Sequence, residues 1–298
     1  MKAQDIMGSP AGILLGMGIS LVIPAPLGYG IARCVARIMR WRRNHLFTTV
    51  RKNLERVVGP NIDAETLDRM AENVIYHAGC CYYDMFRFTR GHLRRGKALQ
   101  VDQATWDYLE SLLSDDRGTI MVGAHISNFD LAAQWIATHG YEIQALSLAT
   151  PDSGDRMVNR LRKFRGIVVT PVSYTALRQA VRRLRNGGVV ITGIDRLVSS
   201  QAPLLTFFGE PARLPTGHVR LAMQTRAHLV VAYCSLEGRG RYRLHILPEV
   251  QLERTGDRER DIVNNAQRVL EQIEQTIRSV PDQWIMFVPV WDELEGKS

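Results

Sequence analysis

The stretch TIMVGAHISNFD, residues 119–130, places an apolar run directly before a histidine and then a pattern that starts a helix. An apolar run of this length is typical of a buried strand. Ser127 and the residues after it have the composition of a helix start. A strand that leads into a helix within so few residues is the repeating unit of α/β folds. His125 is therefore expected at the carboxyl end of a strand, where open α/β sheets bind ligands.

The same alternation continues along the chain and predicts the fold class. The expected strands are the apolar runs at 119–124, 142–149, 166–172, 188–194, 228–236 and 242–250. The expected helices are the segments with helical spacing at 63–97, 127–139, 155–165, 174–186, 216–226 and 260–278. Strands and helices in alternation indicate an α/β fold with a central mixed, largely parallel sheet flanked by helices.

The positive charge is concentrated near the N-terminus. The chain has 38 Lys and Arg residues against 30 Asp and Glu residues, a net charge of +8. Residues 1–100 hold 15 basic and 7 acidic side chains, an excess equal to that of the whole chain. Within them, residues 33–56 contain eight basic side chains and one acid, Glu55. A basic stretch of this density favours phosphate groups, in lipid head groups or in nucleic acid.

The residues before the basic stretch favour the lipid alternative. Residues 6–32 contain no charged side chain and are long enough to meet a bilayer. Pro24 and Pro26 interrupt them, so we expect a helix in the membrane interface or a short insertion rather than one spanning helix. A buried helix with a solvated basic face is the alternative. We assign 1–56 as an N-terminal membrane-associating helical segment and 57–298 as the α/β domain, with an anionic membrane surface as partner and no nucleic acid.

The cysteines indicate a reducing compartment. Cys34, Cys80, Cys81 and Cys234 lack metal-site spacing, and the adjacent pair at 80 and 81 is poorly placed to form a bridge. The histidines show no HExxH arrangement either, so no metal site is predicted. No small-residue cleavage site follows the apolar segment, which argues against a secretory signal. We expect the protein at the cytoplasmic face of a cell membrane.

Two acids are candidates to pair with His125. Asp130 stands five residues later, but Ser127-x-x-Asp130 also forms a capping box, which would explain both residues without chemistry. Asp195 ends the run GGVVITGIDR, residues 187–196, and reaches the same sheet edge as His125 if the two strands are parallel. A surface turn with an Asp195–Arg196 ion pair is the alternative there. An acid on the far nitrogen of His125 would fix its tautomer and stabilise its protonated form.

The residues 123–130, GAHISNFD, resemble the H-x-G-N-W-E/D block of the late acyltransferases of lipid A assembly and of the phosphatidylinositol mannoside acyltransferases. The chain departs from that block at Ser127, in place of Gly, and at Phe129, in place of Trp. Four further blocks resemble the family in order and spacing: RKNLERVVG (51–59), RLRKFRG (160–166), GGVVITGIDR (187–196) and FFGEPARLPTGHVRLAMQTRAHLVVAY (207–233).

The resemblance implies transfer of a fatty acyl group from a thioester, on coenzyme A or acyl carrier protein, to a hydroxyl of a membrane glycolipid or lysophospholipid. His125 would be the general base, a task that suits an imidazole titrating near neutrality. Asp195 is preferred as its direct partner, with Asp130 orienting or capping. Asn128 would position a substrate oxygen or satisfy the loop backbone. The chain has no G-x-S-x-G elbow, so direct attack by the acceptor is expected, with no cofactor beyond the thioester co-substrate.

The other expected substrate contacts follow the family blocks. They are Arg162, Arg196, Phe208, Gly209, Pro215 and Gly217. Arg162 lies in a basic cluster that could hold phosphates or could be a solvated helix face. Trp284 and Trp291 are assigned to the core or to an interface. Two alternatives to an acyltransferase remain open: a lipid or thioester hydrolase, in which water replaces the alcohol, and a basic membrane- or nucleic-acid-binding protein without chemistry.

Overall fold

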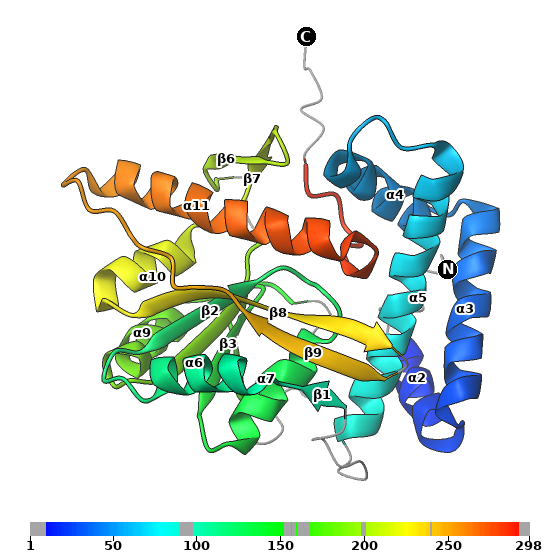
Figure 1. The fold of residues 1–298 in the computed structure, drawn as a ribbon, viewed down its shortest axis with the longest axis horizontal. Helices are drawn as coiled ribbons and strands as arrows, with labels where there is room; N and C mark the ends of the chain where they lie inside the picture. The colour runs from blue at the N-terminus through cyan, green and yellow to red at the C-terminus, as the bar shows by residue number, and fades with distance from the viewer. Residues whose placement is uncertain are drawn as a thin grey trace.

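A seven-stranded sheet forms the centre of the molecule, in the order β1-β9-β8-β2-β5-β3-β4 (Figure 1). The computed structural model describes residues 10–89, 98–151, 156, 159, 167–197, 201–238 and 240–291. The strands are β1 (Leu99–Gln100), β2 (Thr119–Gly123), β3 (Ile143–Ser147), β4 (Ile167–Pro171), β5 (Val189–Gly193), β8 (His228–Gly238) and β9 (Arg241–Ile246). Every neighbouring pair is parallel except β8 with β9. The predicted mixed, largely parallel sheet is confirmed.

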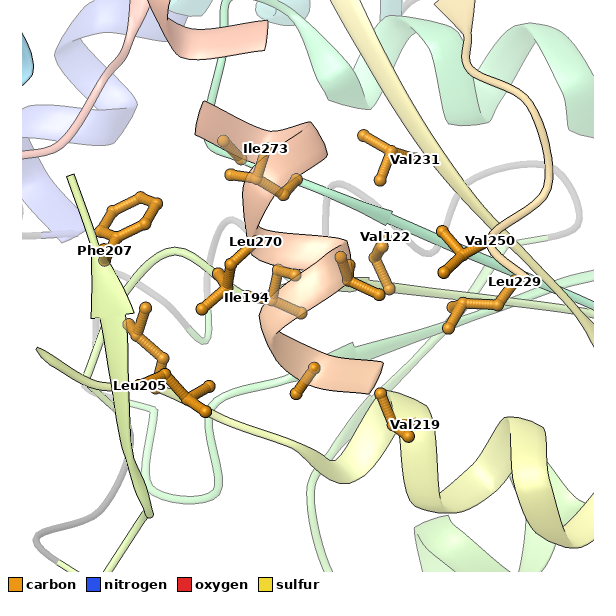
Figure 2. Close-up of a cluster of buried hydrophobic side chains, with 14 of the residues drawn as sticks. Val122, Ile194, Leu205, Phe207, Val219, Leu229, Val231, Val250, Leu270 and Ile273 are labelled. Carbon is orange, nitrogen blue, oxygen red and sulfur yellow. The ribbon is translucent and has the colours of Figure 1, made fainter. Parts of the chain in front are cut away.

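Helices cover both faces of this sheet. One face is covered by α6 (Gln103–Leu113) and α7 (Phe129–Thr138), whose apolar side chains pack on Met121 of β2. The other is covered by α9 (Tyr174–Arg185), α10 (Gly217–Thr225) and α11 (Arg258–Ser279). Figure 2 shows Leu270 and Ile273 of α11 pointing into this second layer, among buried side chains of the sheet. Alternate residues of a strand face opposite sides, so β2 contributes to both layers.

Four helices precede the sheet and form a separate layer at one end of it (Figure 1). They are α2 (Pro10–Val22), α3 (Ala25–Arg42), α4 (His45–Val58) and α5 (Ala64–Thr89). Pro24 occupies the N-cap of α3, so the apolar segment is divided there into two helices. Among the described residues, no helix combines the length and apolar content needed to cross a bilayer. The boundary assigned after residue 56 falls inside α4.

The basic stretch is largely neutralised within the protein. Acids of α5 pair with arginines of α3 and α4, in the contacts Arg40–Glu65, Arg40–Glu72, Arg43–Asp68 and Arg51–Asp68. Asp68 and Glu72 are buried, so these contacts are better shielded from solvent than ordinary surface pairs. Acids of the next helix therefore neutralise part of the positive charge of residues 33–56.

Several elements were not predicted. The hairpin of β6 (Leu204–Phe207) and β7 (Glu210–Arg213) is a separate two-stranded sheet, and β1 and α6 were also missed. The 3-10 helix η2 (Pro281–Gln283) was not predicted either. In the expected helix at 63–97, α5 ends at Thr89, and residues 90–97 lie outside the described part. Most of the helix expected at 155–165 also lies outside it.

Gly118, the residue just before β2, tests the packing directly. A Cβ atom at Gly118 would lie 2.3 Å from the Leu184 carbonyl oxygen, which is backbone and cannot move aside cheaply. We expect Gly118→Ala to lower the free energy of unfolding by about 1–3 kcal/mol. Gly30→Ala is the matched control, because its Cβ meets nothing within 4 Å on α3 and alanine favours a helix. Urea unfolding of both variants measures this, and equal stabilities would contradict the packing described.

Candidate active site

The register of two central strands brings His125 and Asp195 together. Gly123 at the end of β2 lies opposite Gly193 at the end of β5, in a parallel pair. His125 and Asp195 each follow two residues after those glycines, so both emerge from the same edge of the sheet. The parallel pairing on which the sequence argument depended is therefore present.

Asp195 accepts three hydrogen bonds at this edge. The Nδ1 atom of His125 lies 2.6 Å from its Oδ1, and the backbone N–H of His125 donates to Oδ2 at 2.7 Å. The indole N–H of Trp284 donates to the same Oδ2 at 2.8 Å. Asp195 is fully buried, whereas the side chain of His125 is 23% exposed. The carboxylate is thus fixed inside the protein, and part of the imidazole ring reaches solvent.

The contacts of Asp195 keep it ionised. Burial alone would raise the pKa of Asp195, but the imidazole, the His125 backbone amide and the Trp284 indole outweigh burial and hold that pKa below its ordinary value. An ionised carboxylate can only accept hydrogen bonds, so Nδ1 of His125 must be the donor. This fixes the neutral ring as the Nδ1–H tautomer and leaves its Nε2 lone pair available as a base.

The imidazole ring is also restricted by its neighbours. A Cβ at Gly193 would lie 2.8 Å from the His125 Cε1 atom, so a glycine is needed there for the ring to occupy its position. The ring of Phe129 meets the imidazole edge-on, at 5.5 Å between centroids. The backbone N–H of Ile285 donates to the His125 carbonyl at 2.7 Å. Backbone and ring of the histidine are both held in place.

Residues near the C-terminus fasten the loop that carries His125. Ile126 forms an isolated antiparallel bridge with Trp284, and the Ser127 N–H donates to the Gln283 carbonyl at 3.0 Å. The Gln283 side chain in turn bonds both the N–H and the carbonyl of Leu236. Trp284 was assigned to the core; it is buried, and it is also bonded to Asp195. No sequence motif near Trp284 predicted the hydrogen bond to Asp195.

The helix start after His125 differs from the expected capping box. The N-cap of α7 is Asn128, whose Oδ1 accepts from the Leu131 N–H at 3.2 Å. Its Nδ2 donates to the Cys81 carbonyl of α5, and the residue is buried. Both ends of the Asn128 side chain therefore bond the backbone, which favours a structural role in the loop. Ser127 is not the cap: its φ of 50° places it in the left-handed region. That region favours glycine, the residue that stands here in the H-x-G-N-W-E/D block which this stretch resembles.

Asp130 lies in the first turn of α7 and is partly exposed. The hydrogen bond from His125 Nδ1 goes to Asp195, the acid that reaches it across the sheet. A carboxylate in a first turn is favourably placed for the helix dipole. The geometry therefore separates the two candidate acids, with Asp195 on the imidazole and Asp130 at the helix start.

The remaining candidates occupy different surroundings. Phe208 and Gly209, with φ of 52° and 80°, form the two-residue turn of the β6–β7 hairpin, and the Phe208 N–H donates to Glu274 of α11. Pro215 and Gly217 stand at the start of α10. Arg196 is half-buried and, among the described residues, has no ion-pair partner. The alternative considered for Arg196 was an ion pair with Asp195, but the hydrogen bonds of that carboxylate go to His125 and Trp284. Arg162 lies outside the described residues.

Backbone amides between Gly123 and the start of α7 would be the nearest donors to an oxyanion formed beside His125. Three amides in the loop between them are already engaged: His125 N–H with Asp195, Ile126 N–H with the Ala124 carbonyl and Ser127 N–H with Gln283. They serve the structure of the loop instead. Across the described part of the chain, no group of three or more His, Cys, Asp or Glu side chains is arranged to hold a metal ion.

Comparison with known proteins identifies the family. The chain belongs to the bacterial lipid A biosynthesis acyltransferases, whose family model matches residues 6–293. It is an acyltransferase.

Two curated relatives match most of the chain. The phosphatidylinositol mannoside acyltransferase of Mycobacterium tuberculosis (strain CDC 1551 / Oshkosh) is 28% identical over 247 residues, 81% of this chain and 76% of that protein. The protein of the same name from Mycolicibacterium smegmatis is 26% identical, covering 94% of this chain and 90% of the relative. The crystal structure of the 1-acyl-sn-glycerophosphate (LPA) acyltransferase PlsC from Thermotoga maritima aligns with 79% of this chain and 98% of its own, with 17% identity and a TM-score of 0.35.

The indole contact predicts a pH-dependent change in stability. A depressed carboxyl pKa stabilises the folded state above the ordinary pKa, and this contribution disappears as the pH falls through the folded-state value. Trp284→Phe removes one donor and brings the pKa of Asp195 closer to normal. We expect the free energy of unfolding of this variant to be about 1.5–3 kcal/mol lower than that of the wild type near neutral pH. The difference should become smaller toward acid pH.

Urea unfolding across a pH series measures this narrowing. Trp291→Phe is the control, because the Trp291 indole donates to the Phe207 backbone carbonyl and the cation over its ring, Arg56, keeps its charge throughout the acid range. The difference in the free energy of unfolding between Trp291→Phe and the wild type should stay constant with pH. If the difference for Trp284→Phe were also constant with pH, the Trp284 indole would not stabilise the charge of Asp195.

Proposed function

We propose that this acyltransferase moves a fatty acyl group from a thioester of coenzyme A or acyl carrier protein to a hydroxyl of a membrane glycolipid or lysophospholipid, with His125 as general base. The observation that carries the proposal is the buried, ionised Asp195 bonded to Nδ1 of a partly exposed imidazole. That arrangement leaves one ring nitrogen directed outward as a base and prepares the site for the positive charge that the ring acquires.

The proposed reaction proceeds by direct attack. Nε2 of His125 takes the proton of the acceptor hydroxyl as its oxygen bonds to the thioester carbonyl carbon. The tetrahedral intermediate then collapses, the carbon–sulfur bond breaks, and the departing thiolate takes the proton back from the imidazolium. The Asp195 carboxylate remains ionised throughout and stabilises the imidazolium between the two proton transfers. The products are an ester and a free thiol.

Further substrate contacts are proposed for residues of the family blocks. Arg196 follows Asp195 immediately, and its guanidinium, for which the described residues offer no acidic partner, suits a phosphate or the developing oxyanion. The start of α10, at Gly217, offers helix N-terminal N–H groups that also favour an anion, and Pro215 just before it is proposed to contact substrate through its ring. Arg162 is proposed to contact donor phosphates. Phe208 and Gly209 are proposed to contact substrate from the hairpin turn.

The proposed acceptor is a mannosylated phosphatidylinositol or a related glycolipid. The support comes from the activity for which the relatives at 28% and 26% identity are named, phosphatidylinositol mannoside acyltransferase. The family description makes a lipid A precursor the second acceptor to test. We propose an association with the cytoplasmic face of the cell membrane, where such acceptors would be presented. Hydrolysis is the second candidate reaction, because Nε2 could activate water in place of an alcohol.

Replacing the base tests the proposed mechanism. His125→Ala should lower acyl transfer by about 10²–10⁴-fold, because the acceptor hydroxyl loses its proton acceptor. The assay supplies labelled acyl thioester and candidate glycolipids and identifies the labelled lipid by mass spectrometry. Binding to anionic vesicles should be unaffected. Unchanged transfer would contradict the role of His125, and acyl release without lipid product would favour hydrolysis.

The two acids can be distinguished by matched amide substitutions. Asp195→Asn removes the acceptor that fixes the Nδ1–H tautomer, and we expect a loss of about 10²–10⁴-fold in transfer. Asp130→Asn keeps the shape of the first turn of α7, so the loss should be less than about tenfold. Rates are compared at protein concentrations corrected for the folded fraction. The reverse order of losses would make Asp130 the functional partner.

A further inference from the structure

A second buried carboxylate, Asp84 of α5, has no part in the proposed reaction. Helix α5 stands between α3 and the β8–β9 hairpin, and Asp84 receives one hydroxyl from each side (Figure 1). Tyr29 of α3 donates to its Oδ1 at 2.8 Å, and Tyr242 of β9 donates to its Oδ2. All three side chains are buried. This carboxylate therefore joins the N-terminal helices to the sheet.

The charge of Asp84 is held at a cost. Among the described residues Asp84 has no ion-pair partner, whereas the carboxylate of Asp195 faces an imidazole. Burial raises the pKa of Asp84 to about 6, although the two tyrosine hydroxyls and Arg87 oppose the increase. The carboxyl is nevertheless ionised at neutral pH, and an ionised carboxylate can only accept hydrogen bonds. Both tyrosine hydroxyls must then donate toward α5.

The hydroxyl of Tyr242 in turn fixes the side chain of Asn128. With its proton directed at Asp84, the Tyr242 oxygen can accept a hydrogen bond. Burial raises the pKa of Tyr242, and a hydrogen bond from the Asn128 side-chain amide opposes the increase. The same amide also donates to the Cys81 carbonyl at 3.3 Å, and its Oδ1 accepts from the Leu131 N–H. The amide of Asn128 is thus oriented by α5, β9 and α7 together.

Asn128 connects this chain of hydrogen bonds to the imidazole. It is the N-cap of α7, and the next residue, Phe129, meets the His125 ring edge-on. The orientation of the Asn128 amide therefore sets the first turn of α7, against which the ring packs. Small displacements matter at such a position, because a misplacement of about 1 Å can cost about a hundredfold in rate.

We propose that Asp84 is a positioning residue for acyl transfer, which acts through Tyr242 and Asn128 on the ring of His125. This role rests on the proposed function of His125 as base. A neutral amide at position 84 would be cheaper to bury, but it offers a donor as well as an acceptor. It would not require Tyr242 to donate toward α5. The charge of Asp84, and not only its shape, orients the chain that ends at the imidazole.

The two tyrosines on this carboxylate provide matched variants. Tyr242→Phe removes the hydroxyl that leads to Asn128, and kcat should fall by about tenfold while the KM of the thioester hardly changes. Tyr29→Phe removes the hydroxyl that leads to α3, and kcat should stay close to that of the wild type. Assays at about pH 8 keep Asp84 ionised. Equal losses of kcat in the two variants, or no loss in Tyr242→Phe, would overturn the proposed role.

Asp84→Asn separates positioning from stability. The folded-state pKa of Asp84 lies above its ordinary value, so its contribution to stability is present at acid pH and is lost as the pH rises through about 6. A neutral amide avoids that loss. At about pH 8, Asp84→Asn should therefore melt at or above the melting temperature of the wild type and still lose about tenfold in kcat. An unchanged kcat per folded molecule would show that Asp84 is only structural.

Hydrogen exchange tests the positioning without turnover. In the protein without substrate, Tyr242→Phe should speed amide exchange in residues 125–131, and Tyr29→Phe should speed it in α3 instead. Exchange in 125–131 that stays at the wild-type rate in Tyr242→Phe would contradict the positioning role. A wild type that transfers no acyl group would defeat the proposed function, and this role with it. Normal kcat in Tyr242→Phe, beside a wild type that transfers, would defeat this role alone.

Discussion

The site depends on one hydrogen bond, from Nδ1 of His125 to a carboxylate that is completely buried. Burying a charge is costly, and the cost is offset only when every oxygen is bonded. Asp195 meets that condition with an imidazole, a backbone amide and the Trp284 indole. The rest of the architecture serves this arrangement. The parallel register of β2 and β5 sets the distance, Gly193 leaves room for the ring, and Gln283 fastens the loop.

Much of the fold was predictable because its signal is local. A parallel strand buried on both faces needs a continuous apolar run, and each of the six runs became a strand of the sheet. The β6–β7 hairpin was missed because its turn is Phe208-Gly209, which lacks the usual Asn-Gly signal, and its strands are short. The net charge of residues 33–56 was readable, but its neutralisation was not. It depends on Asp68 and Glu72, which only the packing of α5 brings near.

The candidate site was predictable to the extent that its residues follow strands. His125 and Asp195 could be placed at one edge from alternation alone, and the family blocks added the expectation of acyl transfer. Trp284 could not be found, since it reaches Asp195 from 89 residues away through a single indole N–H. Asn128, and not the expected Ser127, is the N-cap of α7, because Ser127 takes a left-handed conformation between the histidine and the helix.

The most direct test of this account is the protonation of the His125 ring, measured by nitrogen-15 NMR on protein with labelled histidine. The signals of His125 are assigned by their absence in His125→Gln. The account predicts that the neutral ring of the wild type carries its proton on Nδ1 and none on Nε2. In Asp195→Asn, the neutral ring should become a mixture of the two tautomers. A neutral ring with its proton on Nε2 and a bare Nδ1 would contradict it, because Asp195 could then not be its acceptor and no base would face the substrate.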